Sequence, residues 1–327
     1  MTDAVITLSS EEAGRLLQEQ LKRWPLAAAN YHALRLVETR SYDLGGFTIR
    51  TQYNPARIVS SGAKTDAKSI EKRPCFLCLH HLPKEQIKLS FRFGEEYLLL
   101  CNPYPIFSEH FTIPSVAHQP QEITSRLEDF LRISRALDKY TLFYNGPKSG
   151  ASAPDHAHFQ AVSSYEMPLD GEIDTIQTSR ERILIDTEEG SLSLLTHYVR
   201  NGFVIRTKSL EQAKRFFYLL CNVAGKGEEP DMNLFCRYRN EMWQIVLILR
   251  KAHRPWQYAA QGEEQILTSP GAADVGGLFI TPRREDFDKI TVAVLRDIYG
   301  QVCYNDAEIA EFRDKIMANW HNIKNKP

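Results

Sequence analysis

The sequence has few cysteines, no long apolar run and almost no net charge, and each of these absences excludes a class of protein. Six cysteines in 327 residues are too few for a disulfide scaffold. No apolar run approaches the roughly 18 residues that suggest a membrane-spanning helix. The formal net charge of −1 gives no overall field for binding nucleic acid or an anionic membrane. Any phosphate-bearing ligand must therefore be bound by local groups.

The first residues, MTDAVITLSSEEAGRLL, are acidic and lack the basic region and apolar core of a secretory signal. We therefore expect a cytoplasmic protein with reduced cysteines. The order of expected elements begins again beyond residue 165, which predicts an α+β protein with two similar tandem halves, 1–165 and 166–327. Helices are expected over 9–24, 121–139, 209–222 and 285–299. Strands are expected over 46–59, 97–101, 110–114, 140–144, 156–163, 232–238, 242–250 and 275–281.

The most informative stretch is 156–160, where two histidines alternate with apolar residues and end on a glutamine. Alternate residues of a β-strand point to the same face. We therefore expect His156, His158 and Gln160 on one surface, with Ala157 and Phe159 packed behind it. A lone histidine on a strand is more often structural than catalytic, so the surrounding residues must decide between the two roles.

A loop of small residues precedes this strand and contains Gly146, Ser149, Gly150 and Ser152. Such a loop lets backbone N–H groups approach an anion closely. A neutral imidazole is a competent nucleophile toward phosphorus. The loop and the strand together therefore favour a phosphoryl-binding site beside a reactive histidine.

Residues 75–78 form a CxxC turn, the spacing with which two thiolates commonly hold half of a tetrahedral zinc site. His80 and His81 follow the turn directly, so a local Cys2His arrangement is one option. The other uses His110 and His156, each at the end of an expected strand. A redox pair and two unrelated thiols stay open as alternatives, although a redox CxxC usually begins a helix and this one follows a polar loop.

Together these motifs resemble the histidine-triad superfamily, in the branch of galactose-1-phosphate uridylyltransferases, GDP-hexose phosphorylases and diadenosine polyphosphate phosphorylases. The CxxC turn at 75–78 is similar to the zinc turn of the uridylyltransferases. Residues 155–160 (DHAHFQ) are similar to the catalytic strand of GDP-hexose phosphorylases, and 269–287 to a run in their C-terminal half. The loop at 149–152 (SGAS) resembles one in the diadenosine polyphosphate phosphorylases, and 110–114 (HFTIP) a strand of small nucleotide-binding members.

The resemblance implies two histidine-triad-like halves, with antiparallel sheets flanked by helices, and assigns roles to individual residues. His158 would be the nucleophile, and Gln160 would hold a phosphoryl oxygen. The implied zinc ligands are Cys75, Cys78, His110 and His156. Asn102 would bind the ribose, although a turn-capping role before a proline is an equal alternative. The other implied substrate contacts are Asn145, Ser149, Gly150, Ser152 and Lys64, the last in the loop where relatives carry phosphate-binding arginines.

Gln160 decides the expected chemistry, because hydrolases of this superfamily have a third histidine there that can protonate the leaving group. Glutamine cannot act as an acid. The resemblance therefore implies a nucleotidyltransferase or phosphorylase that acts on a nucleoside diphosphate sugar or related nucleotide through a nucleotidyl-histidine. Phosphate or a sugar phosphate would accept the nucleotide, and many relatives are dimers. The alternatives are a dinucleoside polyphosphate phosphorylase and a nucleotide-binding zinc protein without turnover.

Other histidines are expected to have no functional role. His80, His81 and His118 lie in expected loops. Residues 251–254 (KAHR) follow an apolar strand and could reach the site from the second half, but we expect them to be the solvated end of the strand.

Overall fold

The computed structural model of the chain describes residues 7–58, 69–70, 73–176, 180–225 and 229–324. Its α-helices are α1 (Ser10–Arg23), α2 (Pro25–Leu34), α5 (Leu127–Ala136), α6 (Pro168–Thr175), α7 (Leu210–Gly225), α8 (Ala272–Val275), α9 (Arg284–Lys289), α10 (Val292–Val302) and α11 (Asp306–Lys324). Its strands are β1 (Glu38–Asp43), β2 (Thr48–Tyr53), β3 (Leu89–Arg92), β4 (Glu96–Cys101), β5 (His110–Pro114), β6 (Tyr140–Asn145), β7 (His158–Ser163), β8 (Glu181–Thr187), β9 (Gly190–Leu195), β10 (Gly202–Thr207), β11 (Met232–Arg239), β12 (Met242–Leu249) and β13 (Leu278–Thr281). Lys64, an expected substrate contact, lies outside the described residues.

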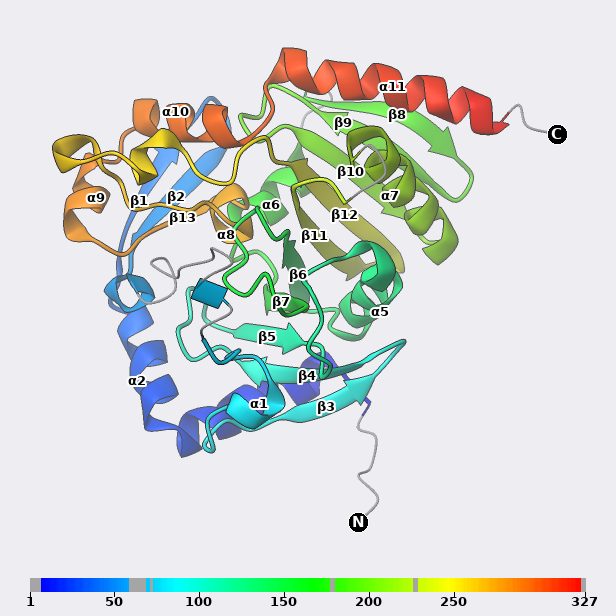
Figure 1. Cartoon of the computed structure of the whole chain (residues 1–327). Helices are drawn as coiled ribbons and strands as arrows, with labels where there is room; N and C mark the ends of the chain where they lie inside the picture. The colour runs from blue at the N-terminus through cyan, green and yellow to red at the C-terminus, as the bar shows by residue number, and fades with distance from the viewer. Residues whose placement is uncertain (1–6, 59–68, 71–72, 177–179, 226–228, 325–327) are drawn as a thin grey trace.

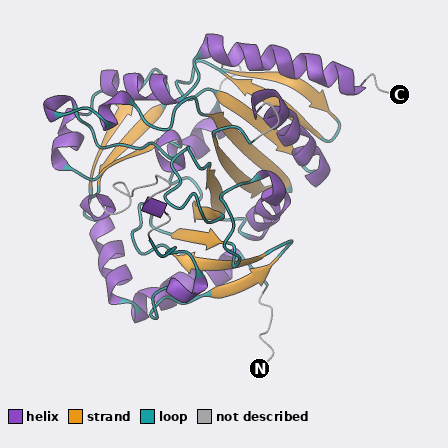
Figure 2. Cartoon of the chain, viewed as in Figure 1, coloured by secondary structure: helices purple, strands orange, loops and turns teal. Residues whose placement is uncertain are grey.

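One antiparallel sheet of ten strands runs through both halves, in the order β3-β4-β5-β7-β6-β11-β12-β10-β9-β8 (Figure 1). Each half contributes five strands with the same connectivity. In each half, three consecutive antiparallel strands are followed by a helix and then by a two-stranded hairpin. The second strand of the hairpin pairs with the third of the three consecutive strands. Helices flank this sheet (Figure 2). The predicted α+β class with repeated antiparallel halves is thus confirmed.

β6 and β11 join the two halves at the centre of the sheet, with the antiparallel register Leu142↔Cys236 to Asn145↔Asn233. Alternate residues of β6 enter opposite cores. Leu142 belongs to the core that contains residues of α1, α5, α7 and α11. Phe143 belongs to the core that contains residues of α6, α8, α10 and β13. Side chains on this second face are the ones that can meet the C-terminal segments.

A second sheet of three strands, in the order β1-β2-β13, contributes to the second core. β13 comes from the C-terminal half and pairs in parallel with β2, from Leu278↔Arg50 to Thr281↔Tyr53. The division of the chain at residue 165 stays a prediction. Because β13 pairs with β2, the three-stranded sheet contains strands from both sides of that division.

Capping residues explain where the helices agree with the expected ones and where they differ. α1 begins as expected, because the Ser9 hydroxyl accepts a hydrogen bond from the Glu12 N–H. The single helix expected over 285–299 is divided, because Thr291 caps a new helix, α10, through the Val294 N–H. Within the described part of the chain, no helix has the length and apolar character needed to cross a membrane.

The loop before β7 crosses a segment of the C-terminal half at two glycines. Gly150 has a φ of 96°, a left-handed conformation that favours glycine. A Cβ atom at Gly150 would lie 2.3 Å from the Cα of Gly271. Two backbones therefore meet here with no room for a side chain.

Gly150→Ala should lower the free energy of unfolding by about 2–4 kcal/mol, since it adds backbone strain and forces two segments apart. Gly300→Ala is the matched control, because that glycine lies in α10 with open space around its Cα. The control should be stabilised by about 0.5–1 kcal/mol. Urea unfolding of the three proteins measures both effects, and equal stability of Gly150→Ala and the wild type would contradict the crossing.

Candidate active site

A cavity of about 490 Å³ lies against β5, β6 and β7 on the second face of the large sheet. Its other walls come from the CxxC turn and from residues 253–280 of the C-terminal half. Apolar side chains form much of the surface, with a small number of polar and charged groups among them. This size and composition are typical of a small-molecule site.

The strand that carries the HxHxQ motif begins two residues later than expected. β7 spans His158–Ser163, and residues 154–157 form a turn and loop before it. On the strand itself the expected alternation is present: His158 and Gln160 line the cavity, and Phe159 is buried in the opposite core. His156 precedes the strand, so its ring does not share their face and lies against Cys75 instead.

His158 is held as a neutral imidazole with one available ring nitrogen. Its Nδ1–H donates to the backbone carbonyl of His156 at 2.8 Å. Burial lowers the pKa of the ring to about 4, so the ring carries no charge at neutral pH. Nε2 therefore keeps its lone pair, which is the form of histidine that can attack an electrophile.

The Gln121 side chain separates β6 from β7 beside His158. The ladder between the two strands stops at Phe143↔Gln160. Beyond that pair, Gln121 Oε1 accepts from the His158 N–H at 2.7 Å. Its Nε2 donates to the carbonyls of His158 and Asn145, at 3.0 and 2.9 Å. A buried carboxamide thus replaces strand pairing and holds the strand ends apart where they line the cavity.

His110 lies outside the cysteine and histidine cluster in which the sequence reasoning placed it. Its Nε2 lies 2.8 Å from Gln160 Oε1, and its Nδ1 accepts from the Ile106 N–H at 3.4 Å. Both ring nitrogens are therefore engaged. Burial, aided by the charge of Arg57, lowers the pKa of His110 to about 3, so the neutral ring donates to Gln160. This contact leaves the NH₂ group of Gln160 as its donor toward a ligand.

Four side chains form a cluster that could hold a metal ion, and its fourth member is His118, which the sequence reasoning treated as an ordinary loop residue. Ligand atoms of Cys75, Cys78, His118 and His156 all lie within 4.8 Å of one another. The two Nδ1 atoms are 3.3 Å apart, and each sulfur lies 3.2 Å from one of them. A tetrahedral zinc site has edges of about 3.3 Å between nitrogens and about 3.5 Å between nitrogen and sulfur. The donor set and its spacing therefore fit such an ion.

Neighbouring hydrogen bonds orient the cluster. His156 Nε2–H donates to the Ser115 carbonyl at 2.7 Å, which leaves Nδ1 as the ligand atom. His81 Nδ1 lies 2.9 Å from the Cys75 carbonyl, so this histidine supports the turn from outside the cluster. The local arrangement with His80 and His81 is therefore not the one that forms.

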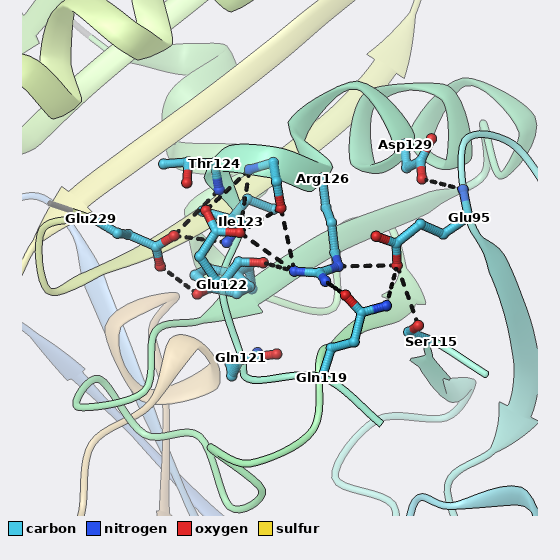
Figure 3. Close-up of polar contacts among 12 residues, drawn as sticks. Glu95, Ser115, Gln119, Gln121, Glu122, Ile123, Thr124, Arg126, Asp129 and Glu229 are labelled. Atoms are coloured by element: carbon cyan, nitrogen blue, oxygen red, sulfur yellow. Dashed lines mark hydrogen bonds and ion pairs between the residues drawn. The ribbon is translucent and has the colours of Figure 1, made fainter. Parts of the chain in front are cut away.

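A network around Arg126 holds the 115–126 segment, which carries His118 of the cluster and Gln121, the partner of His158 (Figure 3). The buried Arg126 guanidinium pairs with Glu95 at 3.1 Å and contacts the Gln119 side chain. Glu95 also accepts from the Ser115 hydroxyl. At the other end of the segment, Glu229 accepts from two backbone N–H groups. Both ends of the segment are thus anchored by carboxylates.

The small-residue loop lines the cavity with Gly150 and Ser152, but not with Ser149. Ser149 is fully buried, and its carbonyl accepts from the Asn233 side chain at 2.7 Å. Asn145 lines the cavity, while its Oδ1 accepts from Asn233 and from a backbone N–H of the C-terminal half. The loop is therefore fixed from behind by the second half of the chain.

Asn102 lines the cavity and also caps a turn. Its Oδ1 accepts from the Tyr104 N–H at 3.0 Å, and its Nδ2 donates to the Thr112 hydroxyl at 3.2 Å. The turn-capping role that the sequence left open is thus present, and a second amide hydrogen stays available to a ligand.

Several cavity residues were missed by the sequence reasoning. His253 and Arg254 line the cavity, although residues 251–254 were expected to be a solvated strand end. Asp274 lies in the 269–287 run that the resemblance had singled out. The sequence left a place in the site open for residues 251–254 but favoured the solvated end, because the approach of His253 to the cavity depends on how the two halves pack.

Two family models match the chain, one in each half. Residues 16–163 match a domain of unknown function, DUF4922. Residues 175–323 match the GDPGP1-like C-terminal domain. Comparison of the sequence with curated proteins gave no match.

Solved structures share the fold over most of the chain. Yeast Ap4A phosphorylase Apa2 superposes with a TM-score of 0.55 over 86% of this chain and 97% of its own, at 14% identity. The same yeast protein in complex with AMP gives a TM-score of 0.53 over 87% and 98%, also at 14% identity. The chain thus shares the fold of a solved phosphorylase, and the GDPGP1-like match together with this fold supports the uridylyltransferase and phosphorylase branch that the motifs predicted. More particularly, its C-terminal half is a GDPGP1-like domain.

Purified protein should contain about one equivalent of metal per chain, and Cys78→Ser should lose most of it, because three ligands hold an ion far less tightly than four. Cys236→Ser is the control, since Cys236 is a buried free thiol outside the cluster. Elemental analysis of the three proteins makes the comparison. Metal-free wild type, or equal content in both variants, would contradict the assignment.

Gln121→Met should lower the free energy of unfolding by about 2–4 kcal/mol, because it leaves one N–H and two carbonyls near His158 without partners. Gln18→Met in α1 is the control, as Gln18 is exposed, and its effect should stay within about 0.5 kcal/mol. Denaturant unfolding tests the pair of variants. A Gln121 variant as stable as the control would show that the carboxamide does not hold the strands.

Proposed function

We propose that the protein transfers a nucleotidyl group from a nucleoside diphosphate sugar or related nucleotide through a covalent nucleotidyl-histidine at His158. The observation that carries the proposal is the state of this ring, which is neutral, fixed through Nδ1 and present in the cavity wall. The GDPGP1-like domain and the likeness to an Ap4A phosphorylase solved with AMP support a nucleotide as the substrate.

In the first step, Nε2 of His158 attacks the α-phosphorus of the nucleotide. A nitrogen–phosphorus bond forms, the bond to the bridging oxygen breaks, and that oxygen leaves with the electron pair. No proton has to be removed first, because Nε2 is already unprotonated. In the second step, an oxygen of phosphate or of a sugar phosphate attacks the phosphorus, and His158 departs with the electrons of its bond.

Gln160 favours transfer over hydrolysis. His110 occupies Gln160 Oε1, so a phosphoryl oxygen in the cavity would meet the NH₂ group. This group stabilises charge on the oxygen but supplies no proton to a poor leaving group. Phosphates and sugar phosphates leave without a proton, so compounds that release them are the expected donors.

We assign the Cys75, Cys78, His118 and His156 cluster to zinc, whose preferred ligands are thiolates and imidazoles. Four protein ligands leave no open position, so the ion would be structural. It would fix the turn at His156, whose backbone carbonyl in turn orients the His158 ring.

Two substrate classes have separate support. The GDPGP1-like domain favours a nucleoside diphosphate sugar, and the yeast structure favours a dinucleoside polyphosphate. Incubating the protein with inorganic phosphate and a panel of both classes, and measuring released nucleoside diphosphate by chromatography, separates them. Nucleotide binding without consumption of any donor would favour the non-catalytic alternative. The cytoplasmic location and the homodimer stay predictions.

His158→Asn should abolish transfer, with a loss of roughly a thousandfold or more, because an amide cannot form the covalent intermediate. His197→Asn is the matched control: its side chain is 69% exposed, and asparagine tolerates its φ of 54°. Wild type and control should retain label from an α-³²P nucleotide on a peptide that contains His158. Wild-type turnover by His158→Asn would refute the covalent mechanism.

A further inference from the structure

Asn145 and Asn233 face each other across the strand pair that joins the two halves, and their side-chain amides are hydrogen-bonded. Asn145 ends β6 and Asn233 lies in β11, where the two residues are register partners. Asn233 Nδ2 donates to Asn145 Oδ1 at 2.9 Å, and both side chains are buried. An amide has one accepting end and one donating end, so its orientation decides whether it attracts or repels an anion. The groups around this pair therefore determine what Asn145 presents to the cavity.

The orientation of the Asn233 amide is fixed on both sides by groups that have a single hydrogen-bonding role. The Arg250 guanidinium is only a donor, and its NH1 lies 2.7 Å from Asn233 Oδ1. The Ser149 carbonyl is only an acceptor, and it lies 2.7 Å from Asn233 Nδ2. A turned amide would place a donor against Arg250 and an oxygen against the Ser149 carbonyl. The NH₂ group of Asn233 therefore has to face Ser149 and Asn145.

Arg250 is itself held in place by hydrogen bonds that match the five N–H donors of its guanidinium. Its side chain is buried. Besides Asn233, it donates to four backbone carbonyls, those of Ala252, His253, Pro270 and Val302. His253 and the residues on either side of Pro270 line the cavity. Arg250 thus ties the Asn233 amide to the segments of the C-terminal half that cover the site.

The Asn145 amide has the matching orientation. Its Oδ1 also accepts from the Ala272 N–H at 2.6 Å, and a backbone N–H can only donate. Two donors therefore occupy the oxygen, and among the described residues the NH₂ group of Asn145 has no hydrogen-bond partner. Asn145 lines the cavity close to His158, because Gln121 Nε2 donates to the backbone carbonyls of both residues. The NH₂ group is thus the part of this amide that a ligand beside His158 would meet.

We propose that Asn233 is a positioning residue: held by Arg250, it keeps the NH₂ group of Asn145 toward the phosphoryl group of the nucleotide. This inference rests on the proposed function. An NH₂ group donates to charged phosphoryl oxygens, whereas an amide oxygen in its place would repel them. The C-terminal half thus sets the orientation of a binding group that belongs to the N-terminal half.

Asn233→Asp tests the orientation directly, because it keeps the shape of the side chain and an acceptor for Arg250 but offers Asn145 only oxygen. By calorimetry, this variant should bind AMP and GMP about 10–100-fold more weakly than the wild type, with unchanged affinity for adenosine and guanosine. Asn233→Ala should lose less, since the Ala272 N–H still holds the Asn145 oxygen. Asn319→Asp is the matched control: it adds the same charge at an exposed position of α11 and should bind as the wild type.

A double-mutant cycle separates the orientation of Asn145 from the added negative charge. In an Asn145→Ala background, Asn233→Asp should cause no further loss of AMP or GMP affinity, because the group through which it acts is absent. The ligand-free melting temperature shows whether each variant is folded, and the same cycle with Asn233→Ala replaces one whose aspartate variant is not.

Three results would overturn the proposal: unchanged monophosphate affinity in Asn233→Asp, an equal loss for the nucleosides, or the same loss in the Asn145→Ala background. A wild type that binds neither monophosphate would overturn it as well. Monophosphate binding that depends on Asn233 through Asn145, with no donor consumed, would keep the positioning role and overturn the proposed transfer.

Discussion

The Gln121 carboxamide between β6 and β7 is the contact on which the rest of the site depends. An unbroken ladder would close the sheet beside His158, whereas a simple split would leave buried backbone groups unpaired at a cost of about 1–3 kcal/mol each. One side chain satisfies three of these groups while keeping the strand ends apart. Gln121 belongs to the 115–126 segment, which also supplies His118 and the carbonyl that orients His156. The cysteine and histidine cluster and His158 are therefore placed by one piece of chain.

The two halves share a topology, but the side chains that line the cavity from the first half have no equivalents in the second. β7 and β12 are equivalent strands, but β12 reads MWQIVLIL and places Trp243 and the apolar residues 245–249 in the two cores. The C-terminal half instead contributes the cover of the cavity. Its residues 269–272 cross the small-residue loop at Gly150, and Asn233 holds that loop from behind through Ser149 and Asn145. A site with its motif in one half thus requires both halves to form.

What the sequence could predict depended on how local each signal was. Period-two alternation is local, so the face shared by His158 and Gln160 was predictable, as was the CxxC turn. The choice between His110 and His118 was not local. His110 ends an expected strand and His118 lies in an expected loop, and neither context indicates a metal ligand. Only the path of the 115–126 segment beside residues 154–158 brings His118 to the cysteines. The place of His253 in the cavity wall was not decided by a local signal either, because it depends on how the two halves pack.

The proposed function places two conflicting electrostatic requirements on the site. A nucleophilic histidine must be neutral, whereas a phosphorylated ligand needs a positive charge. Burial satisfies the first requirement for His158, whose pKa falls to about 4. The same burial would discharge a histidine and weaken a lysine, since desolvation disfavours their charged forms. Arginine keeps its charge under these conditions, with a pKa of about 10 for Arg57. Its field acts on His110, where a lowered pKa keeps the ring neutral and preserves its hydrogen bond to Gln160. Arg57 thus keeps a positive charge in the wall of the cavity that the neutral His158 also lines.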